Sequence, residues 1–299
     1  MASRRVLLTT LTLRSCRAWV APHASRRRHF GAPRAEEDYI ESTTNALVKR
    51  FKRCHRKKHR DAEGVVLVEG RAFVAEVLAR GDDVEAVLVA DDVTLDASLF
   101  ARAKRMARAP DFVLKAASTT DSPQGCVALV ARPDLLFPAA PDFLLALDGV
   151  QDPGNVGALI RTAAAAGVDG VVLVGACADA FNPKTIRGSA GAALRVPLAA
   201  EASWAAAAPR LAELNVVVAD AGAGAVDHLA VESWAQTCLV VGAEAGLTDD
   251  LLGALGALRA TRVRIDVDSS VESLNAAVAG SYLLLDARRR RRRGANNLE

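Results

Sequence analysis

Apolar residues occur in short runs that alternate with turn-rich and alanine-rich stretches. One run covers residues 144–147 and the next covers 171–174. Between them lie a turn rich in glycine and aspartate and a helical stretch from about Asn155 to Ala166. A strand, a loop, a helix and a strand in this order predict a βαβ unit, whose two strands lie parallel in one sheet.

The same alternation predicts a large domain over residues 143–290. Its apolar runs indicate strands at 144–147, 171–174, 216–219, 238–241 and 262–265. Helices are expected at 155–166, 204–214, 248–258 and 272–287. Strands that alternate with helices indicate an α/β fold, in which helices cover a parallel sheet.

A smaller α/β domain is predicted over residues 36–131, beginning with an amphipathic helix at 36–60. The remainder contains predicted strands at 65–69, 84–89, 113–114 and 126–130, and predicted helices at 71–80 and 97–107. Several prolines mark residues 132–142 as the linker between the two domains.

The net charge of +3 conceals an acidic body and basic stretches at 1–35, 49–60 and 288–293. Residues 1–35 are rich in arginine and lack acids, which predicts a presequence for a mitochondrion or a plastid. The alternative is a basic tail that stays on the protein. Residues 291–299 are expected to form a basic, disordered tail.

The run from Lys49 to Arg60 is dense in positive charge and contains no acid. Contacts with phosphates release counterions, so such a run predicts an RNA-binding surface. The alternative is a solvated helix face. The predicted RNA-binding residues are Lys49, Arg50, Lys52, Arg53, Arg56, Lys57, Lys58 and Arg60.

Several classes of protein are disfavoured. No apolar run reaches the roughly 18–20 residues that cross a bilayer, which predicts a soluble protein without a membrane partner. The five cysteines stand singly, so neither a zinc site nor a disulfide framework is expected. Asp266 and Asp268 fit a solvated loop better than a cation site, and no metal is expected. A generic nucleotide-binding domain is disfavoured, because neither a GxGxxG motif nor a P-loop is present.

The loop after residues 144–147 is a candidate functional element. Pro153 and its neighbouring glycines favour a rigid loop that holds Asn155 and Arg161 in place. If Asn155 begins the helix, Arg161 lies about 240° around the axis, so the helix alone does not make them neighbours. Arg161 either faces solvent or belongs to a site that the loop completes.

Two further motifs lie downstream, and together the three resemble a known family. One is a strand with a glycine-rich turn at 240–248, and the other is a strand, loop and helix start at 264–275. With the segment from Asp152 to Ala163 and the intermediate stretch 184–192, their order and spacing resemble the SpoU/TrmH family of RNA ribose 2'-O-methyltransferases. The first domain resembles that family's L30e-like substrate-binding domain, through residues 68–70 and 123–125.

The resemblance implies a SPOUT methyltransferase domain whose parallel sheet is closed by a C-terminal trefoil knot. It implies a homodimer with active sites shared between subunits, and S-adenosylmethionine as the cofactor. The implied cofactor contacts are Gly242, Ile265 and Leu274. The implied catalytic set is Arg161, which orients or deprotonates the ribose 2'-hydroxyl, together with Asn155, Glu244, Ser273 and Asn275.

Three positions depart from the family pattern. Asp266 stands where the family usually has proline, Ala243 where it often has asparagine, and Ala245 where it often has glycine. Loss of the proline is expected to loosen the loop over the cofactor, and Ala245 to restrict φ. None of the three replaces a side chain that is expected to react.

The resulting hypothesis is an S-adenosylmethionine-dependent 2'-O-methyltransferase that acts on ribosomal RNA in an organelle. One alternative is the same activity on transfer RNA. Another is a non-catalytic RNA-binding assembly factor that keeps the fold but not the turnover. The complete set of Asn155, Arg161, Glu244, Ser273 and Asn275 favours an enzyme, because a scaffold has no chemical need for it.

Overall fold

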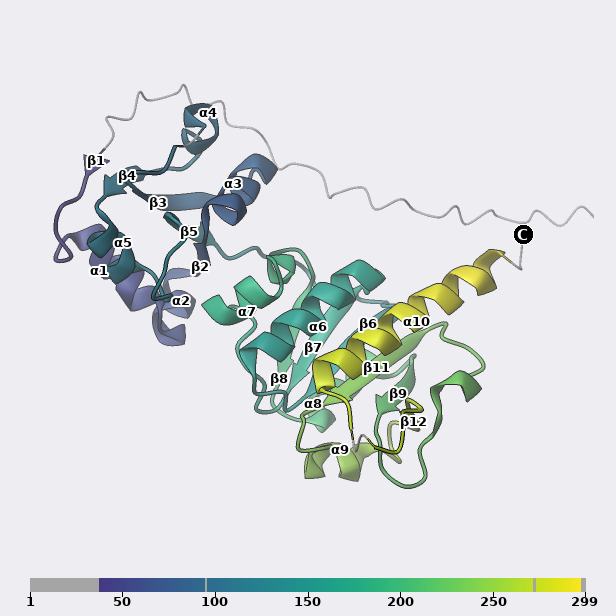
Figure 1. Cartoon of the computed structure of the whole chain (residues 1–299). Helices are drawn as coiled ribbons and strands as arrows, with labels where there is room; N and C mark the ends of the chain where they lie inside the picture. Colours follow the sequence, from purple (N-terminus) through teal and green to yellow (C-terminus); the bar gives the residue numbers. More distant parts are fainter. Residues whose placement is uncertain (1–37, 95, 271–272, 297–299) are drawn as a thin grey trace, which may run out of the picture. The chain divides into compact units, whose positions relative to one another are not determined.

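A computed structural model describes residues 38–94, 96–270 and 273–296. The presequence expected at residues 1–35 lies outside the described residues. Within them, the chain forms two sheets, one of five strands and one of seven (Figure 1).

The five-stranded sheet forms the smaller domain, with the strand order β1-β4-β3-β5-β2. Strand β5 pairs antiparallel with β2 and β3, and β4 pairs parallel with β1 and β3. The strands are β1 (Asp38–Tyr39), β2 (Val65–Glu69), β3 (Val84–Ala90), β4 (Met106–Ala109) and β5 (Cys126–Ala131). The helices are α1 (Ala46–Cys54), α2 (Lys57–Glu63), α3 (Arg71–Arg80), α4 (Ala97–Phe100) and α5 (Asp111–Ala117).

The predicted helix at 36–60 is two helices. Asn45 caps α1 by accepting a hydrogen bond from the Leu47 N–H, and α1 buries an apolar face at Leu47, Val48, Phe51 and Cys54. The chain turns at His55 and Arg56 before α2 begins, because the backbone of Arg56 is extended. The amphipathic pattern therefore identified α1 correctly but not its limits.

Two further predictions in this domain were wrong. The predicted strand at 113–114 lies within α5, which follows Pro110 and buries Val113, Leu114 and Ala117 at helical spacing. The predicted helix at 97–107 shrinks to α4, and the strand β4 follows it. Along β4 the burial alternates from residue to residue, which is the period of a strand.

The seven-stranded sheet of the larger domain is entirely parallel in its pairings, with the order β10-β12-β9-β11-β6-β7-β8. Its strands are β6 (Phe143–Asp148), β7 (Gly170–Val174), β8 (Leu198–Glu201), β9 (Asn215–Ala219), β10 (Val226–Asp227), β11 (Thr237–Gly242) and β12 (Thr261–Arg264). The five predicted strands are confirmed. The short strands β8 and β10 were not predicted, because they lie at the edges of the sheet and are only partly buried.

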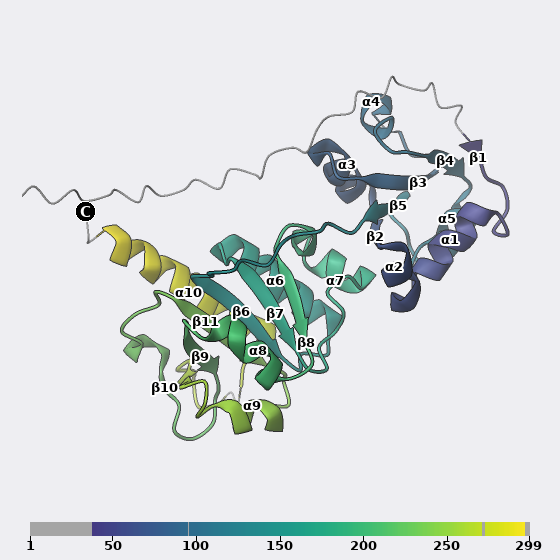
Figure 2. The same ribbon diagram turned by 180° about the vertical axis from the view of Figure 1, so that it is seen from behind.

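Helices cover both faces of this sheet (Figures 1 and 2). One face packs against α6 (Pro153–Ala166) and α10 (Ala276–Asn296), and the other against α8 (Trp204–Leu211) and α9 (Asp249–Ala254). Alternate residues of β6 divide between the two faces: Leu145 and Leu147 join the first core, and Leu144 and Ala146 the second. The short helix α7 (Pro183–Gly188), which was not predicted, packs against α6.

Helix α10 extends through the arginine tract to Asn296, so the disordered tail expected from residue 291 is wrong for the described residues. Residues 297–299 lie outside them. Ion pairs and a cation–π contact join Arg289, Arg290 and Arg291 to other residues of the domain. Arg289 and Arg290 pair with Asp286, one helical turn earlier. Arg291 pairs with Asp142 and lies over the Phe143 ring, 4.8 Å from its centroid.

Gly157 lets α6 approach α7 closely, and this contact gives a testable expectation. A Cβ atom at Gly157 would lie 2.8 Å from the Thr185 carbonyl oxygen and 2.9 Å from the Gly188 backbone. Gly157→Ala is expected to lower the free energy of unfolding by about 1–3 kcal/mol, because the backbones have to separate. Denaturation in urea measures this change.

The control is Gly253→Ala, because a Cβ atom at this helical glycine meets nothing within 4 Å. Here alanine is expected to stabilise by about 0.5–1 kcal/mol through its helix propensity. Equal effects of the two substitutions would contradict the close approach of α6 and α7.

Candidate cofactor pocket and active site

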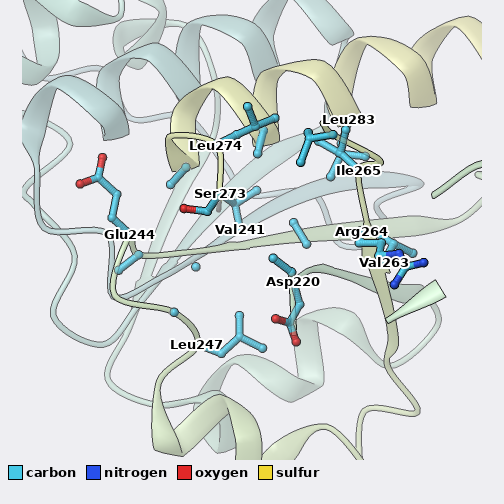
Figure 3. A pocket seen from close by; sticks show the side chains of 18 residues that line it. Asp220, Val241, Glu244, Leu247, Val263, Arg264, Ile265, Ser273, Leu274 and Leu283 are labelled. Atoms are coloured by element: carbon cyan, nitrogen blue, oxygen red, sulfur yellow. The ribbon is translucent and has the colours of Figure 1, made fainter. Parts of the chain in front are cut away.

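A pocket opens at the carboxyl ends of three adjacent strands, β11, β9 and β12 (Figure 3). In open parallel sheets, ligands bind in the crevice outside these ends. The three residues predicted to contact the cofactor, Gly242, Ile265 and Leu274, all line it, as do Glu244 and Ser273. Its apolar wall contains Ala219, Val241, Leu247, Val263, Ala276, Ala279 and Leu283.

The turn after β11 forms one wall of the pocket, and glycines shape it. A Cβ atom at Gly242 would lie 3.0 Å from the Leu247 side chain and 3.2 Å from the Gly246 carbonyl oxygen. Gly246 has a φ of 102°, and its N–H donates to the Ala243 carbonyl oxygen at 2.9 Å. The left-handed conformation therefore falls on Gly246 and not on Ala245, so this turn does not require glycine at position 245.

A buried carboxylate joins this turn to the end of β6. Asp148 is 1% exposed, and it accepts hydrogen bonds from the Trp204 indole N–H (2.8 Å), the Thr248 N–H (2.8 Å) and the Thr248 hydroxyl (2.7 Å). Thr248 also caps α9. The position of the turn beside the pocket therefore depends on Asp148.

Side chains from the three motifs meet beside the pocket. The Asn155 amide donates to Glu244 Oε1 at 3.0 Å, and the Asn275 amide donates to the same oxygen. Asn275 also lies within 3.4 Å of the Asn155 oxygen, and its own oxygen accepts the N–H groups of Ala277 and Val278 at the start of α10. Residues far apart in the sequence thus form one hydrogen-bonded cluster, the Asn155–Glu244–Asn275 cluster.

Asp152 fixes the start of α6. Its carboxylate accepts the Asn155 N–H at 2.9 Å and pairs with Lys184 at 2.9 Å. The hydrogen bond from Lys184, followed by the one from the Asn155 backbone, lowers the pKa of the Asp152 carboxyl. Helix α6 therefore begins at Pro153, two residues earlier than predicted, and Asn155 lies in its first turn.

Arg161 lies on α6, about two and a half turns beyond Asp152, and its side chain is exposed. Among the residues that the structure describes, it makes no hydrogen bond or ion pair, and it does not line the pocket. The structure thus brings together Asn155, Glu244, Ser273 and Asn275 but not Arg161.

The aspartates of the third motif are exposed. Asp268 accepts hydrogen bonds from the Ser270 hydroxyl and N–H, which lower the pKa of its carboxyl. The described part of the chain contains no group of three or more histidines, cysteines or acids that could hold a metal ion. It also contains no helix that is long and apolar enough to cross a membrane.

Two of the eight residues predicted to bind RNA have structural contacts instead. Arg60 is 2% exposed, and it donates to the carbonyl oxygens of Cys54 and His55 and to Asp179. Arg50 is half-buried between Glu63 and Glu85. The helical period places both side chains against the fold, which the charge count alone did not reveal.

The other six basic side chains are exposed. Lys57 pairs with Asp61, and Arg53 lies 3.5 Å from Glu63. Lys49, Lys52, Arg56 and Lys58 have no ion pair among the described residues. These four form the free part of the basic surface.

Sequence reasoning missed Asp148, which is the last residue of β6, and Asp220, which follows directly after β9. The signal that could have found them is a polar residue at the carboxyl end of a strand. The carboxyl ends of β6 and β9 lie at the same edge of the parallel sheet, where ligands bind. Asp220 lines the pocket, and its carboxylate is paired with Arg262.

The comparisons with known proteins agree with this geometry. The sequence model of the SpoU rRNA Methylase family matches residues 142–285, and that of the MRM3-like substrate binding domain matches residues 45–128. The chain is 33% identical to the 23S rRNA (guanosine(2553)-2'-O)-methyltransferase RlmP of Bacillus subtilis, over 83% of this chain and 98% of that protein. The chain belongs to the SpoU rRNA methylase family.

A solved structure and a eukaryotic relative extend the comparison. The crystal structure of an AdoMet-bound rRNA methyltransferase from Sinorhizobium meliloti has a TM-score of 0.72 and 29% identity, and covers 85% of this chain and 98% of that chain. The mitochondrial rRNA methyltransferase 3A of Danio rerio is 29% identical over 77% of this chain and 65% of its own length.

Proposed function

We propose that the protein is an S-adenosylmethionine-dependent RNA ribose 2'-O-methyltransferase that acts on ribosomal RNA. The observation that carries this proposal is the Asn155–Glu244–Asn275 cluster, which joins three separate motifs beside the pocket. Family membership supports the reaction, and the rRNA methyltransferases among its relatives support the substrate.

The pocket suits S-adenosylmethionine in its chemistry. Its apolar walls fit an adenine ring, and its carboxylates, Asp220 and Glu244, fit a ligand that carries hydroxyl groups and positive charge. The residues that would hold the cofactor are Gly242, Ile265 and Leu274, with Ser273 at the same wall. Bound S-adenosylmethionine supplies an electrophilic methyl group.

The protein's own side chains have to orient a ribose hydroxyl toward the methyl group. They also have to help the hydroxyl to lose its proton, because a hydroxyl is a weak nucleophile at neutral pH. The Asn155–Glu244–Asn275 cluster holds the start of α6 and the start of α10 against the pocket. Arg161 orients the 2'-hydroxyl and stabilises the negative charge that develops on it. A guanidinium stays protonated, so positioning ranks above proton abstraction by Arg161.

A second copy of the chain is proposed to complete the site. The α10 residues Val278, Tyr282 and Leu285 are 56%, 47% and 49% exposed, at a spacing that places them on one face of the helix. Helix α10 packs beside α6, which carries the exposed Arg161. An isologous dimer through this face would cover the apolar stripe and bring Arg161 to the partner's pocket.

The trefoil knot is part of the same proposal. Residues of the segments 242–247, 263–267 and 273–276 line one pocket, and α10 then returns across the sheet to α6 and β11. A Cβ atom at Gly280 would lie 2.6 Å from Leu159 and 2.8 Å from Val241, so this return is close. A close return of the last helix across an earlier loop is what a knot at this position requires.

The basic surface of α1 and α2 is proposed to bind the RNA substrate. Replacing Lys49, Lys52, Arg56 and Lys58 together by glutamine is expected to weaken RNA binding. The logarithm of the binding constant falls linearly with the logarithm of the salt concentration. This negative slope is expected to become less steep by roughly 3 to 4, because each lost phosphate contact removes about one released counterion. Binding titrations with ribosomal RNA fragments at several salt concentrations measure this slope.

A control variant replaces two other cations, Lys104 and Arg105, by glutamine; both are exposed but paired, with Asp83 and Asp38. Their loss is expected to change the slope by less than one. An unchanged slope in the fourfold variant, or an equal fall in the control, would contradict this RNA surface.

An organelle is the proposed location, on the basis of mitochondrial relatives and of the basic residues 1–35, which lie outside the described residues. A mitochondrion and a plastid both fit that composition. Import of residues 1–35 fused to a fluorescent protein into isolated organelles distinguishes the two.

The reaction is tested with labelled S-adenosylmethionine and unmodified organellar ribosomal RNA, with transfer RNA as the comparison. Label on a ribose of ribosomal RNA is expected. Label on transfer RNA alone would show that the substrate is transfer RNA and not ribosomal RNA. RNA binding without methyl transfer would favour the assembly factor, and label on a base would overturn the proposed reaction.

A further inference from the structure

We propose that Asp220 is a further cofactor-binding residue, whose carboxylate accepts hydrogen bonds from the ribose hydroxyls of the adenosyl group. This inference rests on the proposed use of S-adenosylmethionine. Asp220 follows β9, which lies between β11 and β12, so it occupies the middle of the three strand ends around the pocket. Its side chain is 15% exposed.

The Asp220 carboxylate is held in place before any ligand binds. Arg262 of the neighbouring strand β12 donates to Oδ2 through Nε and lies against it with Nη2. The Gly222 N–H donates to Oδ1 at 2.8 Å. A Cβ atom at Gly222 would lie 2.8 Å from the Arg262 guanidinium and 3.1 Å from Oδ1, so the loop closes tightly around the pair. A rigid carboxylate binds a ligand with little loss of conformational entropy.

The contacts of Asp220 leave acceptor capacity on both oxygens. An ionised carboxylate has about four lone-pair sites, and these contacts use the sites on the Arg262 and Gly222 sides. Because the guanidinium of Arg262 already balances the negative charge, the carboxylate is better suited to neutral hydroxyl donors than to an ammonium group. Carboxylates at strand ends recognise ribose hydroxyls in the same way in dinucleotide-binding folds.

Glu244, the other carboxylate of the pocket, has a different function. One of its oxygens is already shared by Asn155 and Asn275. Figure 3 shows the two carboxylates on separate parts of the lining and pointing in different directions. Asp220 is therefore the carboxylate that remains for the adenosyl end of the cofactor.

The test is the affinity of the protein for two ligands, measured by calorimetry without RNA or turnover. S-Adenosylhomocysteine carries both the adenosyl and the amino-acid part, and 5'-methylthioadenosine carries only the adenosyl part. Asp220→Ala is expected to weaken both by a similar factor, roughly 10- to 100-fold, because each loses hydrogen bonds to a charged acceptor. Asp249→Asn is the control, since Asp249 is exposed on α9 outside the pocket lining, and both affinities should stay unchanged.

Asp220→Asn provides a milder change in case alanine disturbs the fold, and thermal unfolding identifies that case. For the wild-type protein, the 2',3'-dideoxy form of methylthioadenosine is expected to bind as weakly as methylthioadenosine binds to the variants. Weaker binding of S-adenosylhomocysteine alone would assign Asp220 to the ammonium group and overturn the inference. Unchanged affinity for both ligands would overturn it as well. A wild-type protein that binds neither ligand would instead refute the proposed cofactor.

Discussion

Replacing Arg161 by alanine is expected to lower the rate of methyl transfer about 10²- to 10³-fold, the range seen when a single preorganised donor is removed from an active site. The free energy of unfolding should stay within about 0.5 kcal/mol, because the side chain is exposed and makes no hydrogen bond or ion pair within the described chain. Methyl transfer to ribosomal RNA and denaturation in urea measure the two quantities on the same sample.

Arg259→Ala is the matched control, since Arg259 is an exposed arginine beyond α9 that does not line the pocket. Its activity should equal that of the wild type. Full activity of Arg161→Ala would show that the arginine is a solvent-facing residue of α6 and would remove it from the mechanism.

The same variant tests whether two subunits share one site. Gly242→Val is expected to block the pocket, because even a Cβ atom there lies 3.0 Å from Leu247. Mixed dimers of Arg161→Ala and Gly242→Val subunits should regain activity if each pocket uses its partner's arginine. Mixed dimers that stay inactive would place Arg161 at the pocket of its own subunit.

Replacing Asp148 by alanine is expected to lower the free energy of unfolding by about 3–5 kcal/mol. Each hydrogen bond to a charged group contributes about 1.5–3 kcal/mol, and donors that remain buried without partners add a desolvation cost. The Trp204 indole and Thr248 would lose their acceptor together. Cofactor affinity should also fall, because Thr248 ends the turn that carries Gly242 and Glu244. Denaturation in urea measures the stability.

Asp268→Ala is the control for Asp148, because Asp268 is an exposed carboxylate whose partner is Ser270, two residues later. The free energy of unfolding of Asp268→Ala should stay within about 0.5 kcal/mol of the wild-type value. The loss in the free energy of unfolding for Asp148→Asn should lie between those of Asp148→Ala and Asp268→Ala, since the amide oxygen still accepts hydrogen bonds but carries no charge. A loss below about 1 kcal/mol for Asp148→Ala would contradict the structural importance of these bonds.

Periodicity located most of the core elements correctly, and its errors share a physical cause. Uninterrupted apolar runs such as 144–147 are expected to be buried, and all five predicted strands of the larger sheet are present. The period of short segments is ambiguous, so residues 113–114 were assigned to a strand although they belong to α5. The arginine tract was assigned to a disordered tail, because sequence separation hides the pairing of Arg291 with Asp142.

The residues of the candidate site also divide into those that sequence motifs identified and those that only the structure identified. Gly242, Ile265, Leu274, Glu244 and Ser273 were identified from motifs, and all of them line the pocket. Asp148 and Asp220 were missed, since an aspartate at the carboxyl end of a strand becomes informative only when the neighbouring strands are known. Arg60 and Arg50 were assigned to RNA, because a charge count does not reveal which side of a helix turns inward.

The sequence by itself determined the class of fold, the two domains, the family and the motifs that supply the site. These properties depend on local periodicity and on residue types at short spacing, which a linear chain displays directly. The tertiary structure alone decided that Asn155, Glu244 and Asn275 share a hydrogen-bonded cluster and that Asp148 holds the pocket turn. It also decided that, among the described residues, four of the eight Lys and Arg residues in the run 49–60 have no ion pair. These properties depend on strand order and helix rotation, which bring together residues separated by up to 120 positions.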